Sequence, residues 1–361
     1  MTAASPPVSL ESQLSFPLGQ TLPELGQVLQ VAPGILWLRM NLPFALDHIN
    51  LWLLRDEQDG PHGPVQGWTA VDCGVCNDNT QAAWEKIFAS ALEGLPILKV
   101  VVTHMHPDHM GMAHWLCERW QAPLYISSTE FQAALLASSG GTNFGGPSTQ
   151  AFFAVNGWTQ SEDQLQVGAR VSYYAGMVPL VPQTHHRLMH ETVLHIGGRD
   201  WRCISGFGHS PEHMALYCEP ARVLISGDMV LPKISTNVSV YAQEPEGNAL
   251  ALFLASLKKF DDLPEDTLVL PSHGRPFKGL HTRTSQLHAH HQERLEEVMQ
   301  ACAVKASSAH DMLPVIFKRP LNFHQTTFAM GESVAHLHLL WYSGQLKRRQ
   351  DAQGVWRFSP N

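Results

Sequence analysis

Four side chains of the kinds that bind metal ions lie within six residues of this sequence: His104, His106, Asp108 and His109. They follow an apolar, β-branched run at residues 97–102, which predicts a buried strand that ends at these residues. Open sheets place their binding clefts at the carboxyl ends of strands. Imidazole and carboxylate are the ligands expected for Zn²⁺ and similar divalent ions, so the run predicts a hydrolytic rather than a structural metal site.

The spacing within the run indicates how two ions would be shared. Residues two apart in an extended chain point the same way, so His104 and His106 can bind one cation together. Asp108 and His109 lie past the bend that follows. They can therefore face a second cation a few ångströms from the first.

Three later strands are also predicted to end in a candidate ligand. The segment Cys203–His213 repeats the order of strand, glycines and histidine, and its His209 is the natural third imidazole for the first ion. The next strand ends in Asp228, whose carboxylate can bridge two cations with one oxygen for each. A further strand ends in His273, which would complete the set for the second ion.

An earlier strand, at residues 68–72, ends in a carboxylate as well. Histidines that bind a metal usually need an acceptor for their other ring nitrogen, and Asp72 is better placed in that role than as a ligand. Cys73 and Cys76 form a Cys-x-x-Cys directly after it. Because no second pair of this kind occurs, we expect packing or loop cysteines rather than a redox or zinc motif.

In this order, the motifs closely resemble the metallo-β-lactamase-fold hydrolase superfamily, and most of all its glyoxalase II and general hydrolase branch. The resemblance covers roughly residues 28–280. It implies an α/β fold, an αββα sandwich, here followed by a small, mainly helical C-terminal domain. Departures touch no ligand: Met105 and Pro107 fill variable positions, and Ser-Pro-Glu-His at 210–213 stands where the family often has Thr-Pro-Gly-His. The motifs that carry the resemblance are Asp72, His104 to His109, Gly208-His209, Gly227-Asp228 and Ser272-His273-Gly274.

The resemblance also implies two divalent metal ions, with Zn²⁺ expected and Fe or Mn as alternatives. One ion would be held by His104, His106 and His209, the other by Asp108, His109 and His273, and Asp228 would be shared.

A hydroxide bridging these ions would cleave an ester, thioester or lactone of a small molecule. Asp108 could also orient that hydroxide, and His213 could either donate to a substrate oxyanion or brace its loop. The sequence has neither a Gly-x-Ser-x-Gly elbow for an acyl-enzyme serine nor a phosphate-binding P-loop.

Composition agrees with a globular enzyme. The 361 residues are 44% hydrophobic and 16% charged. The first residues resemble no secretory signal, no apolar run reaches the length of a membrane span, and six scattered cysteines fit a reducing compartment. We therefore expect a cytoplasmic protein that acts on a small molecule, without a membrane partner. A homo-oligomer stays open.

The catalytic region is expected at residues 28–280, after an irregular N-terminal arm at 1–27. Within it, residues 139–190 form a long insertion that could be a lid. Its Tyr173 and Tyr174 could line an apolar substrate pocket or only pack the insertion against the sandwich. Lys233, in the loop 231–237, could meet an anionic substrate or be solvated.

The last part, residues 281–361, has a different sequence pattern from the catalytic region. Helices are expected at 281–303, 308–317 and 325–343, followed by a basic, hairpin-like tail. Three helices and a hairpin resemble the winged-helix appendage of one branch of the superfamily, some of whose members cut RNA. This opens a second function, that of a metal-dependent phosphodiesterase or ribonuclease.

Charge argues against nucleic acid as the substrate. From residue 281 on, nine Lys or Arg face six Asp or Glu, which leaves fifteen against twenty-six in the rest of the chain. A nuclease usually gathers a basic face, because neutralising phosphates supplies most of its affinity. Nucleic acid is not excluded, since bound metals themselves attract phosphate. A third hypothesis, a metal-binding scaffold whose C-terminal module binds a partner, would predict a missing ligand, and none is missing.

Overall fold

The structure is a computed structural model that describes residues 10–44, 46–140 and 145–361. The predicted N-terminal arm and the insertion therefore lie partly outside the described residues. The described part of the arm contains one short 3-10 helix, η1 (Leu10–Gln13), and is otherwise irregular up to the first strand.

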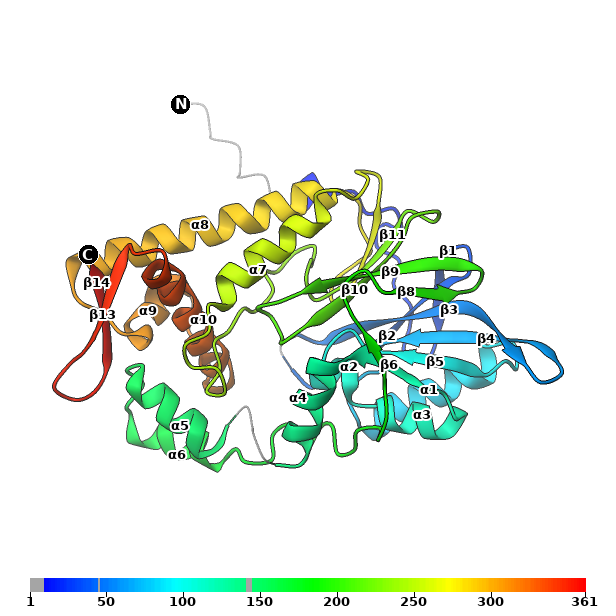
Figure 1. Cartoon of the computed structure of the whole chain (residues 1–361), viewed down its shortest axis with the longest axis horizontal. Helices are drawn as coiled ribbons and strands as arrows, with labels where there is room; N and C mark the ends of the chain where they lie inside the picture. Colours follow the sequence, from blue (N-terminus) through cyan, green and yellow to red (C-terminus); the bar gives the residue numbers. More distant parts are fainter. Residues whose placement is uncertain (1–9, 45, 141–144) are drawn as a thin grey trace.

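Two β-sheets form the centre of the catalytic region (Figure 1). In the first, seven strands lie in sequence order; β1 to β4 pair antiparallel and β4 to β7 pair parallel. Its strands are β1 (Val28–Ala32), β2 (Ile35–Asn41), β3 (His48–Gly60), β4 (Gly63–Val71), β5 (Ile97–Val101), β6 (Leu124–Ser127) and β7 (His186–Leu188).

The second sheet has five strands in the order β12-β11-β10-β9-β8. Only the pair of β11 and β12 is parallel, and the segment that joins these two strands includes helix α7. The strands are β8 (Val193–Ile196), β9 (Arg199–Gly206), β10 (His213–Cys218), β11 (Val223–Gly227) and β12 (Leu268–Pro271).

Alternation along the strands explains why the sheets pack face to face. On β3, Trp52 and Leu54 belong to the core between the sheets, whereas Leu51 and Leu53 pack on the helices outside. On β10, Leu216 faces the inner core in the same way. Because neighbouring residues of a strand point to opposite faces, strands that are apolar at every position need a covering layer on both sides.

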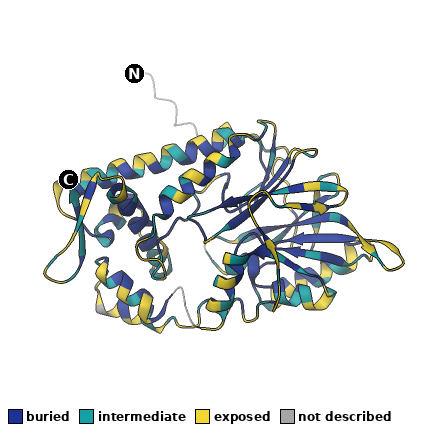
Figure 2. Cartoon of the chain, viewed as in Figure 1, coloured by how far each residue is buried: buried dark blue, intermediate teal, exposed yellow. Residues whose placement is uncertain are grey.

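Helices supply these outer layers, and the fold is the predicted αββα sandwich with a helical C-terminal region (Figures 1 and 2). Leu116 and Phe131, from two helices on the first sheet, share a core with Leu53. The helices of the first sheet are α1 (Asp78–Ser90), α3 (Ala113–Trp120) and α4 (Ser128–Ser138), while α7 (Ala249–Leu257) and α8 (Leu280–Val304) cover the second.

The C-terminal helices lie close to their predicted positions. Besides α8 they are α9 (Ala309–Ile316) and α10 (Phe323–Tyr342), followed by the hairpin β13 (Leu346–Gln350) and β14 (Trp356–Pro360). Their apolar side chains join one core with α7 and the outer face of the second sheet. A domain boundary at residue 281 stays a prediction. None of the helices in the described ranges is long and apolar enough to cross a membrane.

The insertion packs mainly on the C-terminal helices rather than on the sandwich. It contains α5 (Gly146–Val155) and α6 (Ser161–Ala169), which lie beside α9 and α10 in Figure 1. The backbone N–H of His310 donates to the Asn156 carbonyl at 3.1 Å, and the rings of Trp158 and Phe323 are 5.9 Å apart. The end of the predicted insertion, strand β7, instead belongs to the first sheet.

Glu332 of α10 provides a test of how this region packs on the catalytic part. Its carboxylate accepts a hydrogen bond from the Asn237 side chain at 3.1 Å, and burial, opposed by this bond, raises the pKa of Glu332 from 4.5 to about 7. A raised pKa in the folded state means that the unfolded chain ionises first, so stability falls as the pH rises from 4.5 to about 7.

We expect Glu332→Gln to remove this fall. Denaturant unfolding of the metal-free proteins should give equal stability near pH 4, and an advantage for the variant of up to about 3 kcal/mol at pH 8. Parallel stability curves for the two proteins across this range would contradict the burial of an ionisable Glu332.

Candidate metal centre

Loops at one edge of the two sheets bring the predicted ligands together. His104 to His109 follow β5 and enter the short helix α2 (Pro107–Met110), and His209 lies between β9 and β10. Asp228 follows β11 and His273 follows β12. Residues separated by up to 169 positions in the chain therefore form two adjacent groups, each able to hold a cation.

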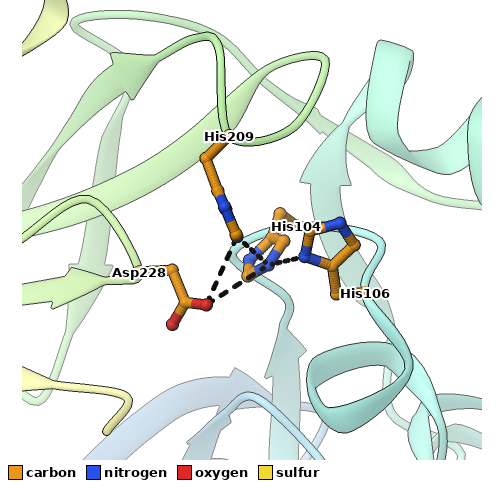
Figure 3. A group of neighbouring side chains, drawn as sticks. All are labelled: His104, His106, His209 and Asp228. Carbon is orange, nitrogen blue, oxygen red and sulfur yellow. Dashed lines mark hydrogen bonds and ion pairs between the residues drawn. The ribbon is translucent and has the colours of Figure 1, made fainter. Parts of the chain in front are cut away.

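The first group consists of His104, His106, His209 and Asp228 (Figure 3). The Nε2 atom of His104 lies 2.9 Å from Nδ1 of His106 and 3.2 Å from Nε2 of His209. Oδ2 of Asp228 lies 3.3 Å from Nε2 of His209 and 4.0 Å from Nε2 of His104. Ligand nitrogens about 2.0 Å from a tetrahedral Zn²⁺ are about 3.3 Å apart, so this spacing suits a single ion.

The second group consists of Asp108, His109 and His273. Oδ2 of Asp108 lies 3.5 Å from Nε2 of His273 and 3.7 Å from Nε2 of His109. The other oxygen of Asp228, Oδ1, lies 3.4 Å from Nε2 of His273 and 3.6 Å from Nε2 of His109. Asp228 thus turns one carboxylate oxygen toward each group.

Two buried atoms at the centre lack a hydrogen-bond partner among the described residues: Nε2 of His109 and Oδ1 of Asp228. Polar atoms shielded from water are normally paired, because an unpaired one costs about 1–3 kcal/mol. A cation placed between these atoms would satisfy both. The nitrogen and oxygen donor set therefore fits divalent metal ions.

Hydrogen bonds on the far side of four histidines fix which ring nitrogen faces the centre. Each Nδ1 has an oxygen partner: Thr103 Oγ1 for His104 (3.1 Å), Asp72 for His109 (2.8 Å), the Asn237 carbonyl for His209 (2.7 Å) and the His48 carbonyl for His273 (2.8 Å). Since Nδ1–H donates outward, the lone pair of Nε2 points inward. This is the orientation that a metal ligand requires.

Asp72 takes the outer position that the sequence suggested. Besides His109, its carboxylate accepts from the backbone N–H of Thr103 at 2.8 Å and from the Thr103 hydroxyl at 2.9 Å. Asp72 has φ = 62°, a left-handed conformation that few residues other than glycine adopt. The strand-end turn that holds this conformation aims the carboxylate at the base of the 104–109 run.

Charges set the protonation of the two groups. Burial, together with the neighbouring imidazoles, holds the pKa of His104 well below its usual range. Burial also disfavours a charge on His109, but the carboxylates of Asp72, Asp108 and Asp228 outweigh it and raise the pKa of His109. The nearby His273 and His109 outweigh the effect of burial on Asp228 and hold its pKa well below the usual value. The ionised Asp228 is thus ready to share a cation.

Sequence reasoning missed several residues that position the ligand loops. The buried carboxylate of Glu130 accepts from the backbone N–H of Met105 at 2.8 Å and from the Ser210 hydroxyl at 2.6 Å, and so joins two ligand loops. Asn50 donates to the carbonyls of Pro271 and Gly274, both at 2.8 Å. Ser127 caps α4 by accepting from the backbone N–H of Glu130, and a serine followed three residues later by Glu indicates a helix cap rather than this role.

His213 lies behind the centre. The backbone N–H of Asp228 donates to its Nε2 at 3.1 Å, the ring is fully buried, and burial lowers the pKa of His213 to about 3. A Cβ at Gly227 would lie 2.0 Å from the same Nε2, so only glycine fits there. These contacts agree with the bracing role; His213 is not among the residues lining the cavity beside the metal centre.

A mainly apolar cavity of about 280 Å³ opens onto both ligand groups. Tyr173 lines it, which is one of the two alternatives that the sequence left open. Tyr174 does not line the cavity. Its ring is buried and its hydroxyl donates to the carbonyl of Met105, so this tyrosine packs against the sandwich and makes no substrate contact. Lys233 is exposed and also lies outside the lining, although Leu231 and residues 234–237 of its loop contribute.

Four separate parts of the chain form the remaining walls. They are the segment after β2, the insertion, the loop after β11 and the start of α10. Besides ligands and Tyr173, the lining includes Leu42, Phe44, Leu46, Met177, Ile234, Asn237, His324 and Phe328.

Comparison with known proteins agrees with this geometry. Among solved structures, a β-lactamase domain protein from Burkholderia ambifaria superposes with a TM-score of 0.92 at 49% identity, covering 98% of this chain and 99% of the other. A metallo-β-lactamase family protein from Thermus thermophilus gives 0.75 at 26% identity, with 92% and 100% covered. The probable metallo-hydrolase YqjP of Bacillus subtilis is 22% identical over 85% of this chain and 92% of its own length.

Two family descriptions match along the chain. Residues 295–361 match the metallo-beta-lactamase-like C-terminal domain, which contains α9, α10 and the hairpin. Residues 65–273 match the Metallo-beta-lactamase superfamily and contain all seven predicted ligands. With more than half of its length in that match, the chain belongs to the metallo-beta-lactamase superfamily.

Proposed function

We propose that this metal-dependent hydrolase holds two divalent ions and cleaves an ester, thioester or lactone of a small molecule. The observation that carries the proposal is the pair of ligand groups joined by Asp228 at the end of a mainly apolar cavity. The first ion would be held by three imidazoles, and the second by two imidazoles and Asp108.

When bound, two such ions supply a nucleophilic water of lowered pKa and polarise the carbonyl under attack. The chain's own residues do the rest. Asp108, which is only partly buried and lines the cavity, is placed to orient the attacking water and accept its proton. The apolar walls contributed by Met177 and Phe328 position the acyl group and exclude bulk water.

The donor set favours Zn²⁺, with Fe and Mn as alternatives. Five imidazoles and two carboxylates without a thiolate suit zinc, which also tolerates the low coordination that a hydrolytic site needs. All six cysteines are free in the structure. Their free state supports the inference that the enzyme works in the reducing cytoplasm.

The cavity supports a neutral region of the substrate next to the metal centre. Among the described residues that line it there is no lysine or arginine. A phosphodiesterase acting on nucleic acid usually gathers cationic side chains along the phosphate backbone that it binds. The C-terminal region instead gives the cavity His324 and Phe328, so we infer that this winged-helix-like region helps to bind a small substrate, as in a glyoxalase II-like enzyme.

One arginine of the basic tail, Arg348, is already engaged within the protein, whereas Lys347 and Arg349 are exposed. Arg348 forms an ion pair with Glu246 at 2.9 Å, and its guanidinium lies 3.9 Å from the ring centroid of Trp341 and 4.1 Å from that of Trp356. A side chain held in this way is not available to a phosphate backbone.

We expect His104→Ala and Asp228→Ala to abolish hydrolysis while the fold persists. Elemental analysis of the zinc-loaded wild type should give two ions per chain, and either variant should bind fewer, because His104 serves the first group and Asp228 both. His195→Ala is the matched control, since His195 is an exposed histidine that pairs with Asp200. Full activity in either ligand variant would contradict the assignment.

Asp72→Asn should weaken metal binding without removing a ligand. Asparagine tolerates the left-handed backbone but carries no charge, so His109 loses its ionised acceptor. We expect the metal dissociation constant, measured by competition with a chelator, to rise about 10–100-fold. Asp266→Asn, on an exposed aspartate, controls for the lost charge. An unchanged constant would show that Asp72 does not support the site.

A substrate panel tests the reaction class. The zinc-loaded protein is incubated with a thioester, an aryl lactone and bis-p-nitrophenyl phosphate, and kcat/KM is compared. We expect one of the two carboxylic substrates to be turned over fastest, because the cavity beside the metals is neutral and mainly apolar. Fastest turnover of the phosphodiester would replace the proposed function by a phosphodiesterase.

A further inference from the structure

A second, smaller cavity of about 30 Å³ lies between the insertion and α10. Phe152 and Phe153 of α5 and Phe328 of α10 make much of its wall. Arg170, directly after α6, is the one cationic residue among the described residues that line it. An arginine in so apolar a wall needs a physical reason.

Arg170 has incomplete pairing. Its Nη2 lies 3.3 Å from Nδ1 of His324, and its guanidinium lies 4.1 Å from the ring centroid of Tyr173. Its Nη1 is buried and has no hydrogen-bond partner among the described residues. No ion pair to Arg170 occurs within the described parts of the chain, and no Asp or Glu lines the cavity there.

An arginine stays charged in a protein, so burying Nη1 without an acceptor is unfavourable. Three hydroxyl-bearing residues, Thr149, Tyr241 and Thr327, also line the cavity, and the Thr327 hydroxyl donates to the His324 carbonyl at 2.7 Å. A buried guanidinium N–H in a small cavity without a carboxylate is a group that binds an anion. An anionic group of a ligand would supply the acceptor that Nη1 of Arg170 lacks.

The small cavity adjoins the metal-side cavity, because the two share lining residues. Tyr173 and Phe328 line both. His324, which contacts Arg170, lines the metal-side cavity. A molecule with one end at the metals and an apolar middle in the larger cavity would have its far end near Arg170.

We propose that Arg170 and this small cavity form a subsite for the terminal carboxylate of the substrate. This rests on the proposed hydrolase function and narrows it: the scissile acyl group lies at the metals, an apolar spacer follows, and a carboxylate ends at Nη1 of Arg170. A volume of about 30 Å³ holds two or three water-sized groups, which fits the two oxygens of a carboxylate better than the four of a phosphate.

Binding of unreactive carboxylates tests the subsite without requiring turnover. Calorimetry on the zinc-loaded protein would give the Kd of each dicarboxylate from succinate to suberate and of the monocarboxylate of the same length. One carboxylate can bind the metals in both compounds, so the second reports on Arg170. We expect the best dicarboxylate to bind about tenfold or more tightly than its monocarboxylate, as a charged hydrogen bond allows.

Variants test whether Arg170 causes this preference for dicarboxylates. Arg170→Met should bring the ratio of the two Kd values close to one, and Arg170→Lys should restore part of it. Ala242→Leu, which fills the cavity but keeps the arginine, should also reduce the ratio. Arg222→Met, which removes an exposed arginine elsewhere, should keep the wild-type ratio.

Two outcomes would overturn the subsite: no preference for any dicarboxylate in the wild type, or the same preference in Arg170→Met. The second result would mean that Arg170 only packs the insertion against α10. Because the readout is equilibrium binding, a protein that prefers dicarboxylates but hydrolyses none of the ester, thioester and lactone substrates would retain the subsite and lose the proposed function.

Discussion

The convergence of imidazole lone pairs on the Asp228 carboxylate is the constraint on which the rest of the structure depends. The Nε2 atoms of His104 and His209, 3.2 Å apart and with their lone pairs turned inward, repel one another unless a cation lies between them. The outer hydrogen bonds hold the rings in place despite this repulsion. The sheets bring the loops together, but it is these outer acceptors, an aspartate, a threonine and two carbonyls, that decide what the loops can bind.

The same outer contacts connect the metal centre to the C-terminal region. The carbonyl of Asn237 holds His209, and the side chain of Asn237 donates to Glu332 on α10. Helix α10 also contributes His324 and Phe328 to the metal-side cavity. Helix α10 is thus part of the wall of this cavity, and the C-terminal helices also share one apolar core with the outer face of the second sheet.

Much of the site could be predicted from the sequence because its ligands end short apolar strands in a fixed order. The helices near residues 281, 309 and 323 were also predictable, since their apolar spacing and polar flanks are local properties. Tyr174 was not: two adjacent tyrosines look alike in sequence, yet one lines the cavity and the other is buried beneath Met105. Glu130 could not be found either, because its partners come from loops whose meeting depends on the whole fold.

The environment of Arg170 could not be predicted from the sequence either. In sequence it is one basic residue at the end of a helical stretch of the insertion, where a solvated side chain is the default. Its partial burial follows from packing between that insertion and α10, two segments separated by more than a hundred residues. Since burying one guanidinium N–H without an acceptor is unfavourable, an anion bound at Nη1 of Arg170 would remove that cost. The position of Arg170 behind Tyr173 and His324 makes the substrate the natural source of that charge.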